Sequence, residues 1–302
     1  MIDPQKESPD FWQEVRAQDG VEALPGRLER YGVAKKRAID QAHFMAPLPG
    51  LATVAARVEN CGSYLLFRHY FTVDKLRLHA ASFCKYHLLC PLCAIRRGAK
   101  ALKAYVDRWE VIRAEKTALR PFLVTLTVKD GPDLQERYRH LYKAQRELWK
   151  RKQRGRGSVL DGVAGAVWSY EFKRGKNSKE WHPHLHMIAL AEVQPDQDDL
   201  RAEWENITGD SFMCDVRPID QEDPVTGFME VFKYAVKFSD QDEADTLHCW
   251  QTFKGVRLIG SAGCFRGVEI PDELIDEFDF DELPYVELLA NFYAGQYHLQ
   301  RR

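Results

Sequence analysis

Three histidines, His182, His184 and His186, alternate with other residues, and an apolar run follows them to Leu190. Alternation at a period of two is typical of a β-strand, so the three side chains are expected on one face of it. Side chains two residues apart on a strand are about 6.6 Å apart along the backbone, close enough for two imidazoles to share one divalent ion. All three would span about 13 Å, so we expect two histidines to bind and another ligand to come from elsewhere. A histidine-rich strand or a purely structural metal site is the alternative.

The segment before this strand indicates where the other ligand lies. Residues 165–172 are rich in aromatic and β-branched side chains and predict a second strand, joined to the first by a polar linker. If the hairpin is centred between positions 177 and 178, Glu171 lies opposite His184, and opposed side chains of an antiparallel pair are about 5 Å apart on one face. A slip of one residue would separate them. Glu171 is therefore the simplest third ligand, and His182 is the alternative.

Length and composition limit the class of protein. The chain has 302 residues, of which 45% are hydrophobic, enough for a packed core and suggestive of two domains. No apolar stretch approaches the roughly 20 residues of a membrane span, and the N-terminus has no signal pattern. The seven cysteines are unevenly clustered, which favours a reduced cytoplasmic chain with a metal site over a disulfide scaffold.

Four cysteines form the cluster. Cys90 and Cys93 have the C-x-x-C spacing that lets two thiolates take adjacent tetrahedral positions around zinc. Cys61 and Cys84 can supply the other pair, with His87 as a substitute for one of them. Buried structural cysteines are the alternative, but this spacing favours a structural Zn²⁺ site.

The net charge of −2 conceals an asymmetry. Residues 268–302 contain nine acidic and two basic side chains, which leaves a net charge of +5 on residues 1–267. A mildly basic body with an acidic tail is compatible with DNA handling and with many other roles. Two groups of cations are candidates for DNA phosphate contacts: one starts a helix expected to run to about residue 115, and the other ends a second helix, expected at about residues 133–152. A solvated helix surface is the alternative. The groups are Arg96 and Arg97, and Lys150, Arg151, Lys152 and Arg154.

Residues 226–238 predict an amphipathic helix that carries three candidate catalytic side chains along one face. Glu230, Tyr234 and Lys237 share one face at helical spacing. A tyrosine in this setting can carry phosphoryl transfer, because its phenolate attacks, the lysine stabilises negative charge and the glutamate moves protons. An exposed helix face with a salt bridge is the alternative. Further along, residues 253–260 predict a strand and residues 286–297 a helix.

Three stretches together resemble the replication initiators of rolling-circle plasmids, the single-tyrosine branch within the HUH endonuclease superfamily. Each motif alone is weak, but their order and separations are specific. The cysteine cluster and residues 254–257 fit the same branch, and the resemblance covers about residues 60–267. The three stretches are Phe122 to Thr127, His182 to His186, and Tyr234 to Lys237 with Glu230 one helical turn before the tyrosine.

The resemblance implies metal-dependent cleavage of DNA. His184 and His186 would bind Mg²⁺ or Mn²⁺, with Glu171 as the acidic third ligand. Tyr234 would attack the scissile phosphate of single-stranded or hairpin origin DNA. The attack would leave a 5′-phosphotyrosyl link and free a 3′-hydroxyl for a polymerase.

The resemblance also assigns the neighbours of the tyrosine. Glu230 matches the glutamate that activates water for the terminating cleavage, and Lys237 positions the site or stabilises charge. No second tyrosine lies at helical spacing beside Tyr234, so termination by water fits better than a two-tyrosine relay.

These observations together predict an α+β fold: an antiparallel sheet with a central histidine strand and flanking helices, the RRM-like core of HUH endonucleases. We expect a zinc-binding and DNA-contacting region at 1–115, the nuclease domain at 116–267 and an acidic tail at 268–302. The expected partners are origin DNA, a host helicase and a DNA polymerase in the bacterial cytoplasm, with no membrane partner and with a homodimer left open. The alternatives are an HUH transposase, which cuts transposon ends by the same chemistry, and a non-catalytic zinc-containing DNA-binding repressor.

Overall fold

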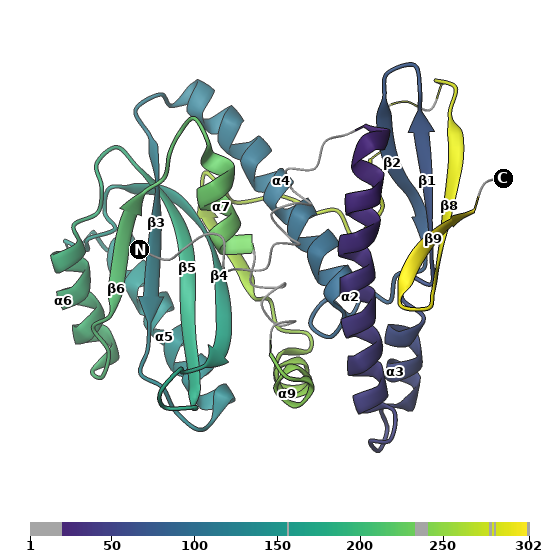
Figure 1. Cartoon of the computed structure of the whole chain (residues 1–302). Coiled ribbons are helices and arrows are strands. Elements are labelled where there is room, and N and C mark those ends of the chain that lie inside the picture. Colours follow the sequence, from purple (N-terminus) through teal and green to yellow (C-terminus); the bar gives the residue numbers. More distant parts are fainter. Residues whose placement is uncertain (1–19, 156, 233–240, 278–279, 281, 301–302) are drawn as a thin grey trace. The chain divides into compact units, whose positions relative to one another are not determined.

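A computed structural model describes residues 20–155, 157–232, 241–277, 280 and 282–300. The chain forms two compact units: unit 1 comprises residues 1–100, 235–250 and 271–302, and unit 2 comprises residues 101–234 and 251–270. The fold is α+β, with two antiparallel sheets and flanking helices, as the sequence predicts (Figure 1). Two helices, α4 (Pro91–Glu115) and α9 (Glu243–Phe253), contribute residues to both units. Within the described residues, no helix has the length and apolar character that crossing a membrane requires.

The sheet of unit 1 joins strands from distant parts of the sequence, in the order β2-β1-β8-β9. The short helix η2 (Val21–Ala23) leads into α2 (Leu24–Met45), which packs against α3 (Ala52–Glu59) and β9. Tyr31 and Phe67 are fully buried in this unit. The strands are β1 (Tyr64–Tyr70), β2 (Lys75–Ala81), β8 (Val286–Tyr293) and β9 (Gln296–Gln300).

The helix expected at residues 286–297 is wrong, because this segment is the hairpin β8–β9. Ala294 and Gly295 both have positive φ angles, the geometry that a tight two-residue hairpin turn needs. β8 also pairs with β1, where Leu65 lies opposite Ala290, and both of these side chains are fully buried. Pairing with a strand far away in the sequence therefore overrides the local helical pattern.

The sheet of unit 2 has the strand order β6-β3-β5-β4-β7, so the histidine strand β5 is central, as predicted. The strand expected at residues 253–260 begins later, at Ile259. Phe253 still belongs to α9, and Gly255, with a positive φ of 80°, follows the helix end in the way a helix-terminating glycine does. The strands are β3 (Arg120–Thr127), β4 (Val163–Arg174), β5 (Trp181–Ala191), β6 (Cys214–Pro218) and β7 (Ile259–Gly263).

Helices cover both faces of this sheet (Figure 1). Helix α5 (Leu134–Gln153) packs on the face that carries Tyr170 of β4, whose ring meets Tyr138 edge-on at 5.4 Å. Helix α7 (Pro224–Phe232) packs on the opposite face, where the Ser169 hydroxyl donates to the carbonyl oxygen of Val231. Neighbouring residues of a strand face opposite ways, so Glu171 shares the α7 face with Ser169. Helix α6 (Gln197–Thr208) lies beside α5 and β6.

Candidate functional site

The β4–β5 hairpin sets which side chains meet. Its register places Glu171 opposite His184 and Ser169 opposite His186, which confirms the pairing predicted from the turn. Phe172 and Trp181 are fully buried on this hairpin, so a slip in register would expose both large rings. The register therefore holds the carboxylate and both imidazoles on the sheet face that α7 covers.

Glu171 lies between the two imidazoles. Its Oε1 is 3.2 Å from Nε2 of His184, and its Oε2 is 3.3 Å from Nε2 of His186. All three residues are buried, and their ligand atoms lie within 4.8 Å of one another. Two imidazole nitrogens and a carboxylate oxygen form a donor set that takes a divalent cation and leaves coordination positions open for other oxygens.

The outer nitrogen of each imidazole is also engaged. Nδ1–H of His184 donates to the carbonyl oxygen of His182 at 3.5 Å, and Nδ1 of His186 lies 3.1 Å from the Thr125 hydroxyl. In the tautomer with the hydrogen on Nδ1, Nε2 of each ring is a lone pair directed toward the Glu171 carboxylate. Within the described residues, Nε2 of His186 is buried without a hydrogen bond. Acceptors that face one another in this way fit a shared cation.

Burial lowers the pKa of His184 to about 4, an effect that the Glu171 carboxylate opposes only in part. The imidazole is therefore neutral near pH 7 and able to act as a ligand. Thr125 was not predicted as a site residue, although it lies in the first of the three stretches that carry the family resemblance and pairs with His186 across the strands. Its role depends on that cross-strand register, for which the sequence offers no local signal.

His182, the alternative third ligand, has another partner. Its Nδ1 lies 2.5 Å from Oδ1 of Asp130, and the Ser178 hydroxyl donates to the other carboxylate oxygen. Burial raises the pKa of Asp130, but the hydrogen bonds from Ser178 and His182 have the larger combined effect. The pKa of Asp130 is therefore below its usual value. His182 is not part of the group formed by Glu171, His184 and His186. Asp130, which follows the end of β3 by three positions, was not predicted as a partner of His182.

Helix α7 carries Glu230, which is half-buried, and its residues Phe228 and Val231 are fully buried. Tyr234 and Lys237, the other two residues of the predicted stripe, lie outside the described residues. Tyr234 follows the last residue of α7 by two positions in the sequence. Their catalytic roles, and that of Glu230, remain predictions.

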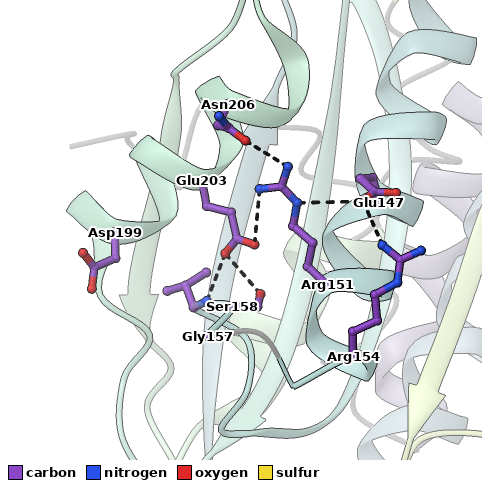
Figure 2. A pocket seen from close by; sticks show the side chains of 9 residues that line it. Glu147, Arg151, Arg154, Gly157, Ser158, Asp199, Glu203 and Asn206 are labelled. Atoms are coloured by element: carbon purple, nitrogen blue, oxygen red, sulfur yellow. Dashed lines mark hydrogen bonds and ion pairs between the residues drawn. The ribbon is translucent and has the colours of Figure 1, made fainter.

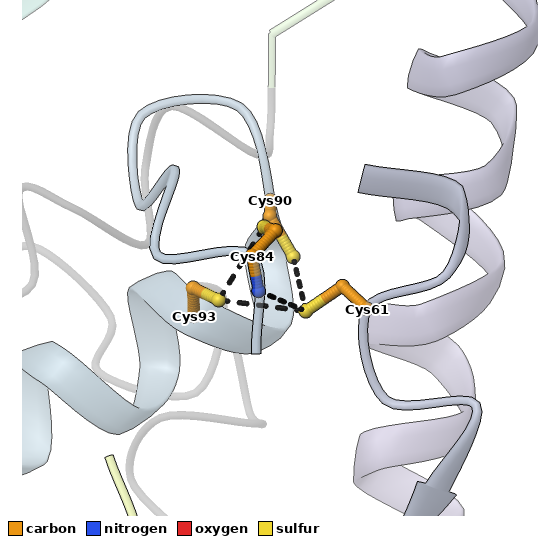
Figure 3. Close-up of side chains that lie close together, drawn as sticks. All are labelled: Cys61, Cys84, Cys90 and Cys93. Atoms are coloured by element: carbon orange, nitrogen blue, oxygen red, sulfur yellow. Dashed lines mark hydrogen bonds between the residues drawn. The ribbon is translucent and has the colours of Figure 1, made fainter. Parts of the chain in front are cut away.

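The four cysteines of the predicted zinc site meet in unit 1 (Figure 3). Sγ of Cys61 lies 3.5 Å from Sγ of Cys90 and of Cys93, and Cys84 lies 3.6 Å from Cys93. Four sulfurs bound tetrahedrally at about 2.3 Å from zinc lie about 3.8 Å apart, so these separations fit a single ion. His87 is not in the group.

Two sequence-distant segments and a helix start supply these thiols. Cys61 follows α3, Cys84 follows β2, Cys90 precedes α4 and Cys93 lies in its first turn. The N-terminus of a helix favours negative charge, so α4 stabilises thiolates at this position. All four side chains are buried, and all seven cysteines of the chain are free of disulfides.

The cations predicted to contact DNA at the start of α4 have acidic partners. Arg96 is buried, and its guanidinium lies 2.5 Å from Oδ1 of Asp276 and donates to the carbonyl oxygen of Leu274. Arg97 lies 3.4 Å from Asp272, an exposed carboxylate. These partners come from the acidic C-terminal segment, about 180 positions away, so no local pattern indicates them.

The second group of cations lies at the end of α5 (Figure 2). Glu147 is within 4.0 Å of Lys150, Arg151 and Arg154, and Glu203 of α6 is 4.0 Å from Arg151. Lys152 sits over the ring of Trp149 at 6.0 Å. Contact of these residues with DNA remains a prediction.

Comparison with known proteins places the chain in a family. The family described as Replication protein (Rep_1) matches residues 75–287, more than half of the chain. The chain belongs to this replication protein family. A relative named Protein rep, from Bacillus sp, is 26% identical over 269 residues, which cover 77% of this chain and 85% of the relative.

Further replication proteins are similar to the same extent. Relatives named Protein rep from Streptococcus pneumoniae serotype 2 (strain D39 / NCTC 7466) and Bacillus amyloliquefaciens are each 26% identical. The matches cover 72% of this chain in both cases, and 71% and 63% of the relatives. No solved structure matches the chain. These findings confirm the resemblance to plasmid rolling-circle replication initiators, while the single-tyrosine mechanism remains a prediction.

Proposed function

We propose that this replication protein nicks single-stranded or hairpin origin DNA and starts rolling-circle replication of a plasmid by a metal-dependent, tyrosine-based strand transfer. The observation that carries the proposal is the meeting of Glu171, His184 and His186 on the sheet face covered by α7. That helix leads within two residues to Tyr234. The helix on the face of the metal ligands therefore ends two positions before the candidate nucleophile in the sequence.

The chemistry needs positioning more than unusual side chains. A divalent ion, when bound by Glu171, His184 and His186, supplies charge that polarises the non-bridging oxygens of the scissile phosphate. The phenolate oxygen of Tyr234 attacks phosphorus, the bond from phosphorus to the 3′-oxygen breaks, and that oxygen takes a proton to become the 3′-hydroxyl. The phosphodiester bond to tyrosine replaces the one broken, so no nucleotide cofactor is required.

Two neighbours of the tyrosine complete the proposed cycle. Glu230 accepts the proton of the water that attacks in the terminating cleavage, and Lys237 stabilises the phenolate or the charge of the transition state. We assign Mg²⁺ or Mn²⁺ to this site on the basis of the family resemblance, and the Glu171 carboxylate and the phosphate oxygens of the substrate are ligands that suit these ions. We assign Zn²⁺ to the four cysteines as a structural ion.

We extend the proposal to domains and partners. The nuclease chemistry belongs to residues 116–267, the zinc-binding region to residues 1–115, and residues 268–302 form the acidic C-terminal segment. Origin DNA is the substrate, and a host helicase and a DNA polymerase act on the nicked product. Membership of the replication protein family supports a plasmid origin over a transposon end as the cleaved sequence.

A covalent-adduct assay tests the proposal. Purified chain is incubated with labelled single-stranded and hairpin origin oligonucleotides and Mn²⁺, and the products are separated on a denaturing gel. We expect a protein–DNA adduct that requires the metal and disappears in Tyr234→Phe, with the control Tyr64→Phe, at an exposed tyrosine of unit 1, unaffected. Glu230→Ala should still form the adduct but release it slowly. An adduct that survives in Tyr234→Phe, or DNA binding without any cleavage, would refute the proposed mechanism and favour a repressor.

A further inference from the structure

The exposed side of α5 carries four cations at helical spacing. Arg139, Lys143, Arg146 and Lys150 follow one another at i, i+4, i+7 and i+11, so they project from one side of the helix. We call these four residues the α5 stripe. All four are exposed, and they extend over about 16 Å of the helix axis.

Three members of the stripe lack carboxylate partners. In the part of the chain that the structure describes, no ion pair forms to Arg139, Lys143 or Arg146, whereas Glu147 lies 4.0 Å from Lys150. The guanidinium of Arg146 lies over the ring of Tyr142 at 5.7 Å, which leaves its charge uncompensated. This differs from the end of α5, where Glu147 and Glu203 share Arg151.

The stripe lines a hollow. The four cations border it together with His140, Tyr142, Ala144, Glu147 and, from α6, Ile207. Glu147 compensates Lys150, so, among the described residues, three uncompensated cations remain around the hollow. A cluster of this sign is complementary to a polyanion, and phosphate groups are the anions that such clusters bind along nucleic acids.

The hollow lies on the far side of the sheet from the candidate metal ligands. α5 packs on the face of Tyr170, whereas Glu171 faces α7. A nucleic acid on the α5 stripe is therefore held apart from the strand that would reach Glu171 and its imidazoles.

We propose that the α5 stripe binds the phosphate backbone of duplex DNA, at a site distinct from the one that cleaves the single strand. Single-strand sites combine cations with several aromatic platforms for base stacking, but Tyr142 is the one exposed aromatic ring among the described residues that border this hollow. The length of the stripe, about 16 Å, exceeds the roughly 12 Å width of a B-DNA major groove, so the helix can reach phosphates on both strands. The inference rests on the proposed function only in taking DNA as the partner.

A binding experiment with the full chain tests this assignment. The stripe variant carries Arg139→Gln, Lys143→Gln and Arg146→Gln, and the control variant carries Arg113→Gln, Lys116→Gln and Arg217→Gln, three exposed cations elsewhere in unit 2. Both lose three positive charges, and glutamine keeps the helix propensity of α5. Affinity for a 20-base-pair duplex and for one of its strands is measured by fluorescence anisotropy across a salt series, without added divalent ion.

In a plot of log affinity against log salt concentration, each phosphate contact makes the slope more negative by about 0.9. The slope for the stripe variant should therefore be less negative by about 3. The same relation predicts at least a tenfold weaker Kd for duplex DNA at about 0.1 M salt. Single-strand affinity, and both affinities of the control variant, should stay within about twofold of the unmodified chain. A second variant with Arg139→Lys and Arg146→Lys keeps the charges and should bind duplex normally.

Three results would overturn the assignment. They are unchanged duplex binding by the stripe variant, an equal loss in the control variant, and an equal loss for the single strand. A loss that the charge-keeping variant shares would likewise assign the effect to the fold of α5 and not to its cations. The binding experiment does not depend on cleavage. The stripe can therefore be confirmed or refuted even if the covalent-adduct assay shows that the chain does not cleave DNA.

Discussion

Thr125 contacts the candidate metal site through one ring nitrogen. Its hydroxyl lies 3.1 Å from Nδ1 of His186, on the side of the ring away from Glu171. Such an outer partner fixes the orientation of a metal-binding imidazole and raises its basicity. Thr125 therefore acts on metal affinity without being a ligand.

Replacing Thr125 with valine should weaken Mn²⁺ binding by about 10- to 100-fold, because the ring of His186 loses the contact that orients it. Isothermal titration with Mn²⁺ measures the change, and the melting temperature without metal checks the fold. The matched control is Thr127→Val in the same strand, whose hydroxyl donates to the carbonyl oxygen of Met213. Equal affinity losses in the two variants would contradict an orienting role for Thr125.

Asp276 carries a carboxylate whose ion pairs should make the stability of the fold depend on pH. Its carboxylate contacts the guanidinium groups of Arg96, at 2.5 Å, and Arg27, at 3.0 Å, and accepts a hydrogen bond from the backbone N–H of Leu78. Burial raises the pKa of Asp276, but the two arginines and this N–H outweigh that effect and hold it well below its usual range. The ionised form is therefore the one that stabilises the fold.

A carboxyl group with a depressed pKa contributes stability that is complete above its unfolded-state pKa of about 4 and is lost as pH falls toward its folded-state pKa. Asp276→Asn should lower the free energy of unfolding by about 3 kcal/mol at pH 7, because two guanidinium groups lose their counter-charge. The difference between the unmodified chain and the variant should shrink below about pH 4. Urea denaturation from pH 7 to pH 3 measures it, and a difference independent of pH would refute the ion-pair explanation.

At the scale of elements, the four cysteines tie together the end of α3, the segment after β2 and the start of α4. A bound zinc ion would connect these elements where the sheet of unit 1 meets its helices. Its binding free energy would then contribute directly to the folding of unit 1.

The purified chain should contain one zinc ion, and Cys93→Ser should remove it and lower the melting temperature. Elemental analysis measures the zinc content, thermal unfolding measures the melting temperature, and thiol alkylation measures the accessibility of Cys90 and Cys93. Cys214→Ser is the control, since the Cys214 thiol donates to the carbonyl oxygen of Gln197 outside the cluster. A zinc-free chain with readily alkylated Cys90 and Cys93 would exclude a structural zinc site.

The elements that the sequence predicted well are those whose partners are near in the chain. The β4–β5 register followed from the hairpin turn, because Glu171 and His184 are only 13 positions apart and bury their faces together. Residues 286–297 were predicted wrongly, because their strand state depends on pairing with β1, which no local pattern records. The turn at Ala294 and Gly295, between two aromatic runs, was the signal available.

The same distinction applies to the candidate site. Alternation predicted His184 and His186, and hairpin geometry predicted Glu171. The contacts of Thr125 and Asp130 depend on β3 and on the segment that follows it, which pair with the histidine strand across the sequence. Arg96 was predicted to contact DNA because it lies in a group of cations. Its neutralising partner, Asp276, is 180 positions away, so the sequence does not indicate that pair.

At the scale of the whole molecule, the acidic C-terminal segment is part of the fold of unit 1. It supplies β8 and β9 to the sheet and Asp276 to the buried arginines. Without these strands, β1 and β2 would form an isolated two-stranded hairpin, which is marginally stable in water.

Truncation after Ile270 should therefore destabilise unit 1 and leave unit 2 with its own sheet intact. Hydrogen exchange should show loss of protection in β1 and β2, with β3, β4 and β5 still protected. A shorter truncation, which removes only Arg301 and Arg302, is the control. Normal protection of β1 in the longer truncation would show that the segment is dispensable for folding.

The pairing of Leu65 with Ala290 also sets an order of events during synthesis. A ribosome releases β1 and β2 early, but their neighbour β8 emerges only after all five strands of the other sheet have been made. The histidine hairpin can thus assume its final form on the nascent chain, while the sheet of unit 1 cannot be completed until β8 has been synthesised. A message cut short near its 3′ end would yield a polypeptide whose candidate catalytic half is folded and whose other half is open to proteolysis.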